Sequence, residues 1–330
     1  MKQLVRNVNI IGTGSYVPEK IYTNEYLETI VPTNAEWIYE NVGIRERRIA
    51  APDQATSDLA TEAGRRALED AGLKPEDIDL IIVATATPDR KAPSTAAFVQ
   101  HKLNAFNAAA FDLSAVCSGF LFSMSVASQY IASGVYNNVL VIGADTFSRI
   151  TDWTRRDAIF FGDGAGAAVV SQANVNEGFL AYRLYTDTSN EMLGFTVPGG
   201  GSERPLTADN LDEQYFQMNG KAVFKSATTA LPKAINQVFK DTGLTVNDVD
   251  FMIPHQPSIR ILQETAEIIG LPFEKVMTNM DKYANTTGGT VPIILDETRK
   301  SGKLKKGDIV LFAAVGSGWT YGAALMKWAL

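Results

Sequence analysis

The sequence is poor in the residues that hold metals and disulfides. Its 330 residues include one cysteine, Cys117, and two histidines, His101 and His255. One cysteine excludes an intrachain disulfide framework, and with so few thiols and imidazoles an ordinary cysteine/histidine zinc site is also excluded. We therefore expect no bound metal.

Long apolar runs and targeting signals are also missing. No uninterrupted apolar stretch reaches the roughly 18 residues that a membrane span needs. Residues 1–6 lead directly into a strand-like run at 8–12 and lack the apolar core and cleavage site of a signal peptide. We expect a cytoplasmic protein without a membrane partner.

The composition is that of an ordinary globular protein. Hydrophobic residues make up 45% of the chain and charged residues 20%, with 26 glycines and 13 prolines, so the chain can bury a large core. Acidic residues number 37 and basic residues 30, a formal charge of −7. This charge argues against nucleic acid as the main partner.

The chain repeats itself once. Residues 70–82 align with residues 241–253, with Gly72 matched to Gly243, 171 positions later. In both copies a helix ends at the glycine, a short turn follows, and an aspartate leads into a buried strand. Residues 133–143 also align with residues 301–313, at offsets of 168 to 170. The repeat predicts an α/β protein with two similar halves, 1–173 and 174–330.

Cys117 is a candidate nucleophile. The apolar run 111–116 predicts a buried strand, and apolar residues spaced three and four apart in 117–133 predict a helix. A thiol at the start of a helix faces free N–H groups and the positive end of the dipole, so we expect a lowered pKa. The alternative is an inert buried cysteine that packs as a small hydrophobe.

His255 and Asn285 are the candidate partners of Cys117. His255 follows the apolar run 251–254 and stands at the exit of a predicted strand, whereas His101 fits the surface of a helix. Moving Cys117 by about 170 positions leads to residues 283–290 (YANTTGGT), so the repeat brings two helix starts toward one centre. A thiol, an imidazole and a carboxamide there suit thioester chemistry. The alternatives are that Asn285 and residues 316–318 form ordinary turns, and Asp163 is expected to order a loop.

Together these residues resemble the β-ketoacyl-acyl-carrier-protein synthase III family, of the thiolase fold, over essentially the whole chain. The supporting segments are 37–38 (WI), 43–47 (GIRER), 161–167 (FGDGAGA), 254–256 (PHQ), 283–286 (YANT) and 315–322 (VGSGWTYG). The resemblance implies two pseudo-symmetric halves in a five-layered α-β-α-β-α arrangement, and a homodimer.

The resemblance implies a condensation in two stages. Cys117 is acylated by an acyl-CoA, and a malonyl thioester, on acyl carrier protein or as malonyl-CoA, then loses carbon dioxide and attacks the acyl group. His255 and Asn285 donate hydrogen bonds to the enolate oxygen, and the backbone N–H groups of Cys117 and Ser317 form a second oxyanion hole. Ser317 replaces a glycine that is usual in the family. Acyl-CoA is a substrate, and no metal or redox cofactor is required.

The residues for CoA and carrier protein match the family less well. Trp37, Arg155 and Arg260 match CoA-binding positions, with Trp37 and Arg155 on either side of the adenine. Asn41 stands where an arginine is frequent.

Lys225 and Arg260 match positions that dock the carrier protein. Glu267 and Ile268 replace basic residues on the helix after His255, which weakens the attraction for an acidic carrier. The alternative is that these basic residues are ordinary solvated surface charges.

Ala92 matches the acyl-pocket gate, which the partner subunit contributes and which is phenylalanine in members that prefer acetyl groups. An alanine leaves that pocket open, so we expect a primer longer or bulkier than acetyl. The alternative is that another side chain fills the space.

Two further functions remain open. One is a related ketosynthase of secondary metabolism that makes a diketide or a resorcinol- or cyclohexanedione-type product. The other is an acyltransferase that passes the acyl group of Cys117 to an alcohol or amine, although such relatives often change the asparagine, which Asn285 retains.

Overall fold

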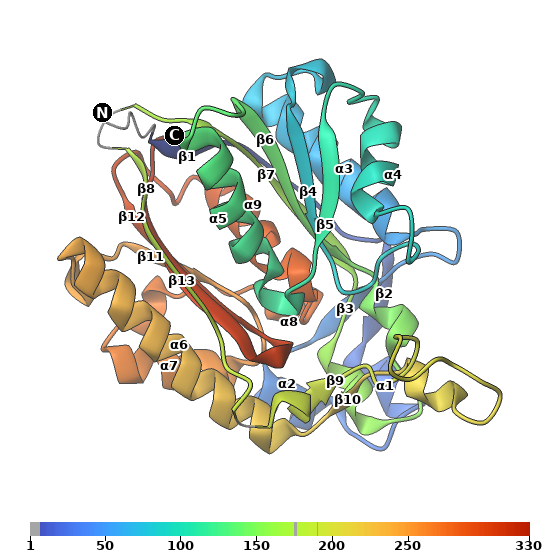
Figure 1. The fold of residues 1–330 in the computed structure, drawn as a ribbon. Helices are drawn as coiled ribbons and strands as arrows, with labels where there is room; N and C mark the ends of the chain where they lie inside the picture. Colours follow the sequence, from blue (N-terminus) through green and yellow to red (C-terminus); the bar gives the residue numbers. More distant parts are fainter. Residues whose placement is uncertain (1–6, 175–176, 190) are drawn as a thin grey trace.

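Two β-sheets organise the protein, for which a computed structural model describes residues 7–174, 177–189 and 191–330 (Figure 1). The first sheet has the strand order β1-β7-β6-β4-β5 and the second β11-β12-β13-β8. The first sheet contains β1 (Val8–Tyr16), β4 (Leu80–Ala84), β5 (Ala109–Leu113), β6 (Asn138–Asp145) and β7 (Gly164–Gln172). The second contains β8 (Gly178–Thr186), β11 (Phe251–Pro254), β12 (Ile309–Gly316) and β13 (Thr320–Lys327). The expected lead-in at residues 1–6 lies outside the described residues.

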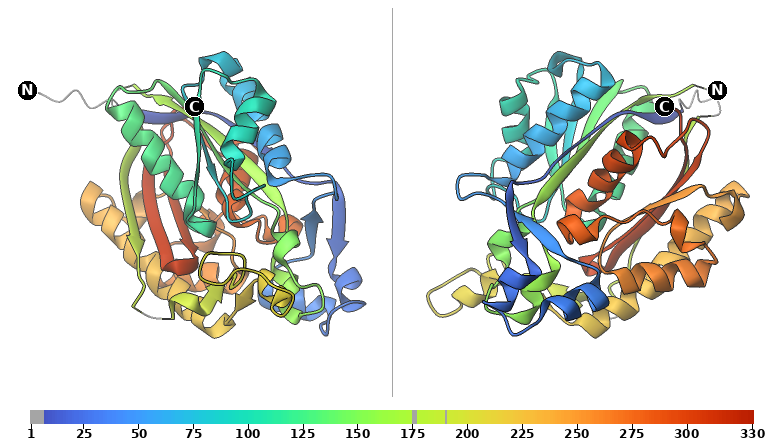
Figure 2. Two further views of the ribbon diagram at one scale, coloured as in Figure 1. Left: turned by 45° about the vertical axis from the view of Figure 1, so that its right-hand side comes forward. Right: turned by 180° about the vertical axis from the view of Figure 1, so that it is seen from behind.

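Helices form three layers around the sheets (Figures 1 and 2). The outer face of the first sheet carries α3 (Thr56–Ala71) and α4 (Thr95–Leu103), and the outer face of the second carries α6 (Gly220–Thr242) and α7 (Ile259–Ile269). Between the sheets lie α5 (Gly119–Ala132) and α9 (Thr290–Lys300). The predicted five-layered α-β-α-β-α arrangement is confirmed.

The sequence of α5 explains its place in the middle layer. Apolar residues surround most of this helix, and a helix that is apolar all round is stable only when buried on every side. Phe120, Leu121, Met124 and Ala127 are each at most 2% exposed and share one core cluster with strands of both sheets. The start of α5 is therefore held at the centre of the molecule.

The internal repeat is visible in matching hydrogen bonds. Gly72 and Gly243 end α3 and α6 with φ values of +66° and +73°, where glycine is favoured because it has no Cβ. Beyond them, the carboxylate of Asp79 accepts a hydrogen bond from Asn138 N (3.1 Å), and that of Asp250 accepts one from Ile309 N (2.8 Å). Asn138 and Ile309 are thus equivalent, 171 positions apart.

This register corrects the second sequence match, in which Val139 was paired with Ile309. Leu80 of β4 pairs with Val139, and Phe251 of β11 pairs with Val310, so Val139 corresponds to Val310. A shift by one residue would turn each side chain to the other face of the sheet, so the buried patterns fix the offset at 171.

The segment before α3 packs across the two halves. It contains α1 (Asn24–Glu28) and α2 (Ala35–Val42), flanked by the paired strands β2 (Lys20–Thr23) and β3 (Glu46–Ile49). Leu27 and Ile38 belong to the same core cluster as Leu231 and Leu262 of α6 and α7. The proposed boundary at residue 173 separates the strands of the two sheets, but this early segment packs with the later half.

The remaining elements lie near the ends of the central helices. They are α8 (Met280–Tyr283) and the short paired strands β9 (Phe195–Thr196) and β10 (Gln217–Met218). Among the described residues, no helix is both long and apolar enough to cross a bilayer.

Candidate active site

Cys117 lies in a tight turn between β5 and α5. The turn is the 3₁₀ helix η2 (Val116–Ser118), so α5 begins two residues after Cys117 and not at it. Val116 has a φ of +47°, a conformation that β-branched residues rarely adopt. The Ser118 hydroxyl donates to Ala115 O and to Thr320 Oγ1, both at 2.8 Å, which fixes the turn against the second sheet.

The expected lowering of the Cys117 pKa is wrong in this structure. Burial raises the pKa of the Cys117 thiol, and the nearby carboxylate of Asp145 raises it further. A hydrogen bond from the backbone N–H of Cys117 acts in the opposite direction but is the smaller effect. The thiol is only 8% exposed, so a thiolate would lose most of its hydration.

His255 follows β11 and is neutral. Its backbone N–H donates to Ala313 O of β12 at 2.8 Å, which holds the residue at the edge of the second sheet. Burial lowers the pKa of His255 to about 3, because the charged imidazolium is excluded from water. Among the described residues, its Nδ1 has no hydrogen-bond partner.

Asn285 is fixed at each of its oxygen atoms. Its backbone O accepts from Gly162 N at 3.1 Å, and its side-chain Oδ1 accepts from Thr287 N at 2.8 Å. Asn285 N donates to Phe160 O at 3.0 Å. Because Oδ1 is occupied by an N–H donor, the amide NH₂ is the group left to donate to a ligand.

The three candidate residues line one cavity. It has a volume of about 50 Å³ and holds Cys117 from the first half of the chain with His255 and Asn285 from the second. The rest of the lining is mostly apolar: Phe195, Val223, Ala227, Pro257, Val315, Gly316, Ser317 and Trp319. A reactive sulfur and two neutral polar groups therefore face a nearly dry space.

The end of β12 approaches the Cys117 turn closely. A Cβ on Gly316 would lie 2.8 Å from Ala115 O and 3.0 Å from Cys117 N, so only glycine fits there. Ser317 is next in the chain, and its hydroxyl donates to Phe195 O at 2.5 Å. The serine side chain thus bonds to the neighbouring strand β9, and the oxyanion role of the Ser317 N–H stays a prediction.

Arg156, and not Arg155, contacts the candidate adenine platform. Asn34 caps α2 by accepting a hydrogen bond from Trp37 N at 2.7 Å, and the Arg156 guanidinium lies 4.3 Å from the centre of the Trp37 ring. Arg155 instead pairs with Asp157 and donates to Phe216 O. Arg156 begins the 3₁₀ helix η4 (Arg156–Phe160) and Arg155 precedes it, so the two side chains contact different partners. The place of Arg155 on the other face of the adenine stays a prediction.

The other predicted binding residues are spread over the surface. Arg260, in the first turn of α7, donates to Asn41 Oδ1 of α2. Lys225 is exposed on α6 and lines a separate hollow of about 170 Å³ with Lys233. Ala92 is in an exposed loop and does not line the Cys117 cavity within this chain.

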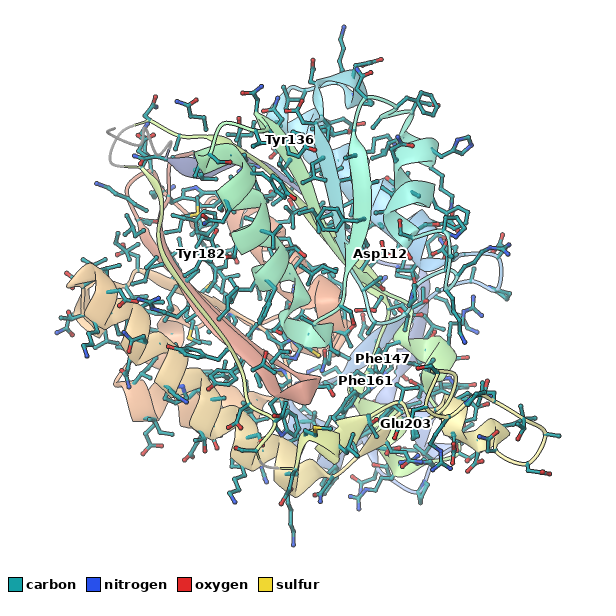
Figure 3. All side chains as sticks on the ribbon, viewed as in Figure 1. Asp112, Tyr136, Phe147, Phe161, Tyr182 and Glu203 are labelled. Carbon is teal, nitrogen blue, oxygen red and sulfur yellow. The ribbon has the colours of Figure 1, made fainter. Side chains whose placement is uncertain are left out.

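Four phenylalanines form a cluster that reaches the cavity through one member. Phe195 lines the cavity and stacks on Phe216, with centroids 5.6 Å apart and planes at 11°. Behind them Phe147 and Phe161, labelled in Figure 3, lie 4.4 Å apart between centroids. Sequence reasoning missed this cluster, because its members are scattered along the chain and meet only through the fold.

Sequence reasoning also missed Asp145, the last residue of β6. It is fully buried and lies close enough to Cys117 to raise the pKa of that thiol. The available signal was an acidic residue three positions after the apolar run 139–142, since a buried carboxylate needs specific hydrogen-bond partners.

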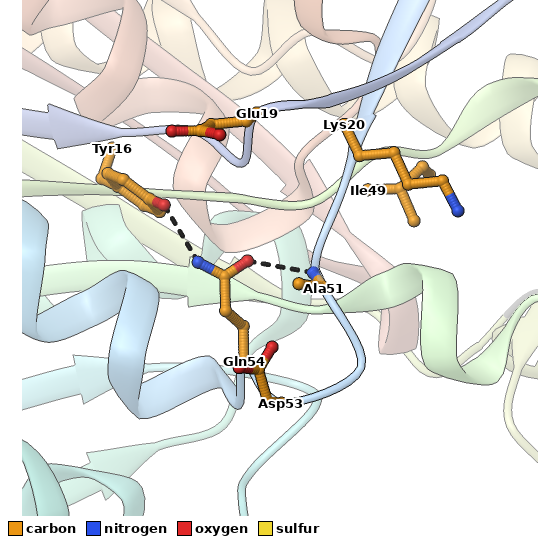
Figure 4. A pocket seen from close by; sticks show the side chains of 7 residues that line it. All are labelled: Tyr16, Glu19, Lys20, Ile49, Ala51, Asp53 and Gln54. Atoms are coloured by element: carbon orange, nitrogen blue, oxygen red, sulfur yellow. Dashed lines mark hydrogen bonds between the residues drawn. The ribbon is translucent and has the colours of Figure 1, made fainter.

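A larger groove lies elsewhere, beside β1 and β3. It has a volume of about 580 Å³ and is lined by Tyr16, Glu19, Lys20, Ile49, Ala51, Asp53 and Gln54 (Figure 4). Gln54 donates to Tyr16 Oη and accepts from Ala51 N, both at 2.9 Å, so its amide is already used. None of the three candidate residues reaches this groove. In the described ranges, no three histidine, cysteine or acidic side chains are arranged to hold a metal ion.

Family models match both parts of the chain. The model of 3-oxoacyl-[acyl-carrier-protein (ACP)] synthase III matches residues 111–188, and the model of its C-terminal part matches residues 239–328. Among curated proteins, a β-ketoacyl-[acyl-carrier-protein] synthase III from Caldanaerobacter subterraneus is 49% identical over 97% of each chain. One from Clostridium acetobutylicum is 43% identical over 98% of this chain and 99% of the relative.

Solved structures agree with this result. The crystal structure of 3-oxoacyl-[acyl-carrier-protein] synthase III from Aquifex aeolicus covers 97% of this chain and 100% of its own, with a TM-score of 0.90 and 42% identity. The priming β-ketosynthase of the R1128 polyketide pathway has a TM-score of 0.91 and 31% identity, covering 100% of this chain and 98% of its own. The chain belongs to the β-ketoacyl-[acyl-carrier-protein] synthase III family of thiolase-fold condensing enzymes.

Proposed function

We propose that the protein joins an acyl-CoA primer to a malonyl thioester, through an acyl group carried on Cys117. The observation that carries this proposal is the cavity in which the single cysteine meets a neutral imidazole and an oriented carboxamide. This set matches a reaction in which a thioester is attacked and an enolate must then be stabilised.

In the first stage the Cys117 sulfur attacks the acyl-CoA carbonyl. The S–H bond breaks, a new C–S bond forms, and the CoA sulfur leaves and takes up a proton. The N–H groups of Cys117 and Ser317 would stabilise the negative oxygen of the tetrahedral intermediate. Because burial keeps Cys117 as a thiol, this proton has to leave as the substrate binds and reacts.

In the second stage the malonyl carboxylate leaves as carbon dioxide, and its electron pair forms an enolate. The enolate carbon attacks the acyl carbonyl, the bond to sulfur breaks, and the Cys117 thiolate recovers a proton. His255 and Asn285 would bind the enolate oxygen as neutral donors. A histidine that stays neutral can donate a hydrogen bond without protonating the carbanion, and its low pKa fits that role.

The cavity of about 50 Å³ within one chain holds only a few heavy atoms. A primer longer or bulkier than acetyl therefore needs additional space. We place this space at the loop of Ala92 from a second subunit, where a small side chain leaves room. An acyl-CoA series from two to eight carbons measures the preference, and the proposal is wrong if acetyl-CoA reacts fastest.

The homodimer is part of the same proposal. β5 is an edge strand of the first sheet, and Phe106 shortly before it is 63% exposed. An uncovered strand edge next to an exposed aromatic side chain is a typical pairing surface. Light scattering should give twice the mass of the chain, and the mass of one chain would contradict the dimer.

The malonyl donor is proposed to be malonyl-acyl carrier protein, with malonyl-CoA as the second choice. Arg260 and the exposed Lys225 offer positive charge, but Glu267 and the 51% exposed Ile268 on α7 reduce it.

The likeness to the R1128 priming ketosynthase favours a polyketide-type role as the second candidate function. The lone reduced cysteine fits a reducing compartment such as the cytoplasm.

Intact-mass measurement tests the proposal directly. The protein is incubated with each acyl-CoA, with Cys117→Ala as the blank, and malonyl-acyl carrier protein or malonyl-CoA is added afterwards. An acyl adduct that only the wild type forms, and that a malonyl donor removes, supports condensation. Removal by an alcohol or amine would instead support the acyltransferase alternative, and no adduct at all would contradict a CoA primer.

A further inference from the structure

Asp145 ends β6 inside the protein and accepts an unusual number of hydrogen bonds. It is 0% exposed, and its donors come from two separate segments. The donors after β4 are Thr85 Oγ1 (3.1 Å), Ala86 N (2.8 Å), Thr87 N (3.1 Å) and Thr87 Oγ1 (2.8 Å). The donors before α9 are Thr287 Oγ1 and Gly288 N (2.8 Å), in the 3₁₀ turn η9 (Thr287–Gly289).

These donors fix Asp145 as a carboxylate. The backbone N–H groups of Ala86, Thr87 and Gly288 can only donate, so a proton on the acid would meet other protons. Burial raises the pKa of Asp145, and the hydrogen bonds from Thr287, Gly288, Ala86 and Thr87 oppose that rise. We take the ionised form because backbone N–H groups donate to both carboxylate oxygens, Ala86 and Thr87 to Oδ1 and Gly288 to Oδ2.

The second set of donors connects Asp145 to Asn285. Thr287 has a φ of +49°, which a β-branched residue adopts only when its surroundings hold it there. Its hydroxyl donates to Asp145 Oδ2, and its backbone N–H donates to Asn285 Oδ1 at 2.8 Å. The strained turn that orients the Asn285 amide is thus tied down by the Asp145 carboxylate.

We propose that Asp145 is a positioning residue for the malonyl stage, which holds the Asn285 amide toward the cavity through Thr287. This inference rests on the roles proposed above for Asn285 and Cys117. It has a second consequence, because the same buried charge lies near Cys117 and disfavours the thiolate. Asp145 therefore supports condensation and slows reactions of the free thiol.

Asp145→Asn separates the two effects. Asparagine keeps an oxygen that can accept from the donors after β4. Its NH₂ group then faces Gly288 N–H and cannot accept from it, so the hydrogen bond that holds η9 is lost. Asp296→Asn is the matched control, because Asp296 is a 1% exposed carboxylate on α9 that accepts from Thr13 Oγ1 at 2.7 Å. Thr287→Val replaces the hydroxyl with a methyl group, and Thr287→Ser retains the hydroxyl.

The first measurement is a single turnover. Each variant is acylated with the acyl-CoA that gives the most adduct in the panel and freed of excess, and malonyl-acyl carrier protein is then added. Loss of the acyl mass should slow about 10- to 100-fold in Asp145→Asn. Thr287→Val should slow in the same direction, with Thr287→Ser faster than Thr287→Val, and Asp296→Asn should change less than threefold.

The second measurement is alkylation of Cys117 by iodoacetamide between pH 6 and 10. Among the described residues, the titratable groups that face Cys117 are Asp145 and His255. In Asp145→Asn the curve of alkylation rate against pH should move to lower pH. At pH 7 Cys117 should then react about threefold or more faster than in the wild type. General damage to the fold would also expose the buried thiol, so urea unfolding of each variant must show that the faster alkylation occurs in folded protein.

Asn285→Ala distinguishes failure of this inference from failure of the proposed function. Normal condensation by Asn285→Ala would overturn the proposed role of Asn285. Slow condensation by Asn285→Ala with an unchanged condensation rate in Asp145→Asn would overturn only the positioning role of Asp145. An unchanged alkylation profile would overturn only its effect on the Cys117 thiol. If Asp145→Asn does not fold, Thr287→Val decides the positioning role, and a rate equal to wild type would refute it.

Discussion

The two 3₁₀ turns that precede α5 and α9 share a backbone and differ in their side chains. Val116 and Thr287, 171 positions apart, have φ values of +47° and +49°, and each turn leads into a central helix. The next residue is Cys117, the proposed nucleophile, in one turn and Gly288 in the other. A duplicated framework has thus produced the same strained turn twice, at about 1–3 kcal/mol each, but only one of the two holds a reactive group.

The strand ends beside these turns differ in a complementary way. Asp145 ends β6, and its carboxylate accepts a hydrogen bond from Gly288 N. The equivalent residue at the end of β12 is Gly316, which has no side chain that could accept from Cys117 N. The turn before α9 thus donates to the Asp145 carboxylate. Among the described residues, Gly316 offers no such acceptor to the N–H of Cys117, which fits the proposed binding of a substrate oxyanion there.

The largest expected effect comes from Cys117→Ala, which makes the two turns chemically alike. Without the sulfur no acyl-enzyme can form, so condensation should fall at least about 10³-fold and the mass adduct should disappear. The measurement is product formation from acyl-CoA and malonyl-acyl carrier protein. Cys117→Ser serves as a control that keeps a polar group of similar size, and an active Cys117→Ala protein would contradict covalent catalysis.

A smaller effect is expected from adding one methyl group to either turn region. In Gly316→Ala the new Cβ meets backbone atoms of the Cys117 turn at 2.8 to 3.1 Å, so acylation should slow about 10- to 100-fold. In Gly288→Ala the new Cβ meets Ala84 O and Asp145 Oδ2 at 3.0 Å, and the later condensation stage should suffer more than acylation. Rates of both stages, measured separately by intact mass, check this. Equal effects on both stages in both variants would show that the two turns are not specialised.

The smallest expected effect concerns stability at low pH. The pKa of His255 is about 3 in the folded protein and near 6.5 in an unfolded chain, so the unfolded state binds a proton first as the pH falls. The contribution of neutral His255 to the free energy of unfolding is fully present above pH 6.5. It is lost between pH 6.5 and 3, at about 1.4 kcal/mol per pH unit. From pH 7 to pH 5 the free energy of unfolding should fall by about 2 kcal/mol more in the wild type than in His255→Gln.

Urea unfolding at the two pH values measures this difference. His101→Gln is the matched control for the loss of one imidazole, because His101 is exposed on α4. A His255→Gln protein with the same pH dependence as the wild type would show that burial does not keep His255 neutral.

Much of the architecture could be predicted because local patterns repeat. The glycine that ends a helix, the aspartate before a strand and the apolar run that follows occur twice, and both copies form the elements predicted for them. The exact offset could not be read from residues 133–143 and 301–313, because similar apolar residues align equally well one position apart. Only pairing between strands selects the register.

The site was predictable at its centre and less so at its edge. Cys117, His255 and Asn285 stand at recognisable junctions of strand and helix, and the structure brings them to one cavity. Arg156 lies beside Trp37 and Arg155 pairs with Asp157, because the direction of a side chain in an irregular segment depends on its tertiary contacts. The segment around α2 also packs with α6 and α7, a contact between distant parts of the chain that no local pattern predicts.

The sequence by itself determined the two α/β halves, the chemical groups available for catalysis and the helix starts that carry them, since these follow from local periodicity and residue type. The tertiary structure alone decided the properties that depend on surroundings. Burial keeps Cys117 a thiol and His255 neutral, and the Asp145 carboxylate joins segments 142 residues apart to orient Asn285. Charge states and long-range hydrogen bonds depend on which atoms exclude water from a group, and this is set only when the chain has folded.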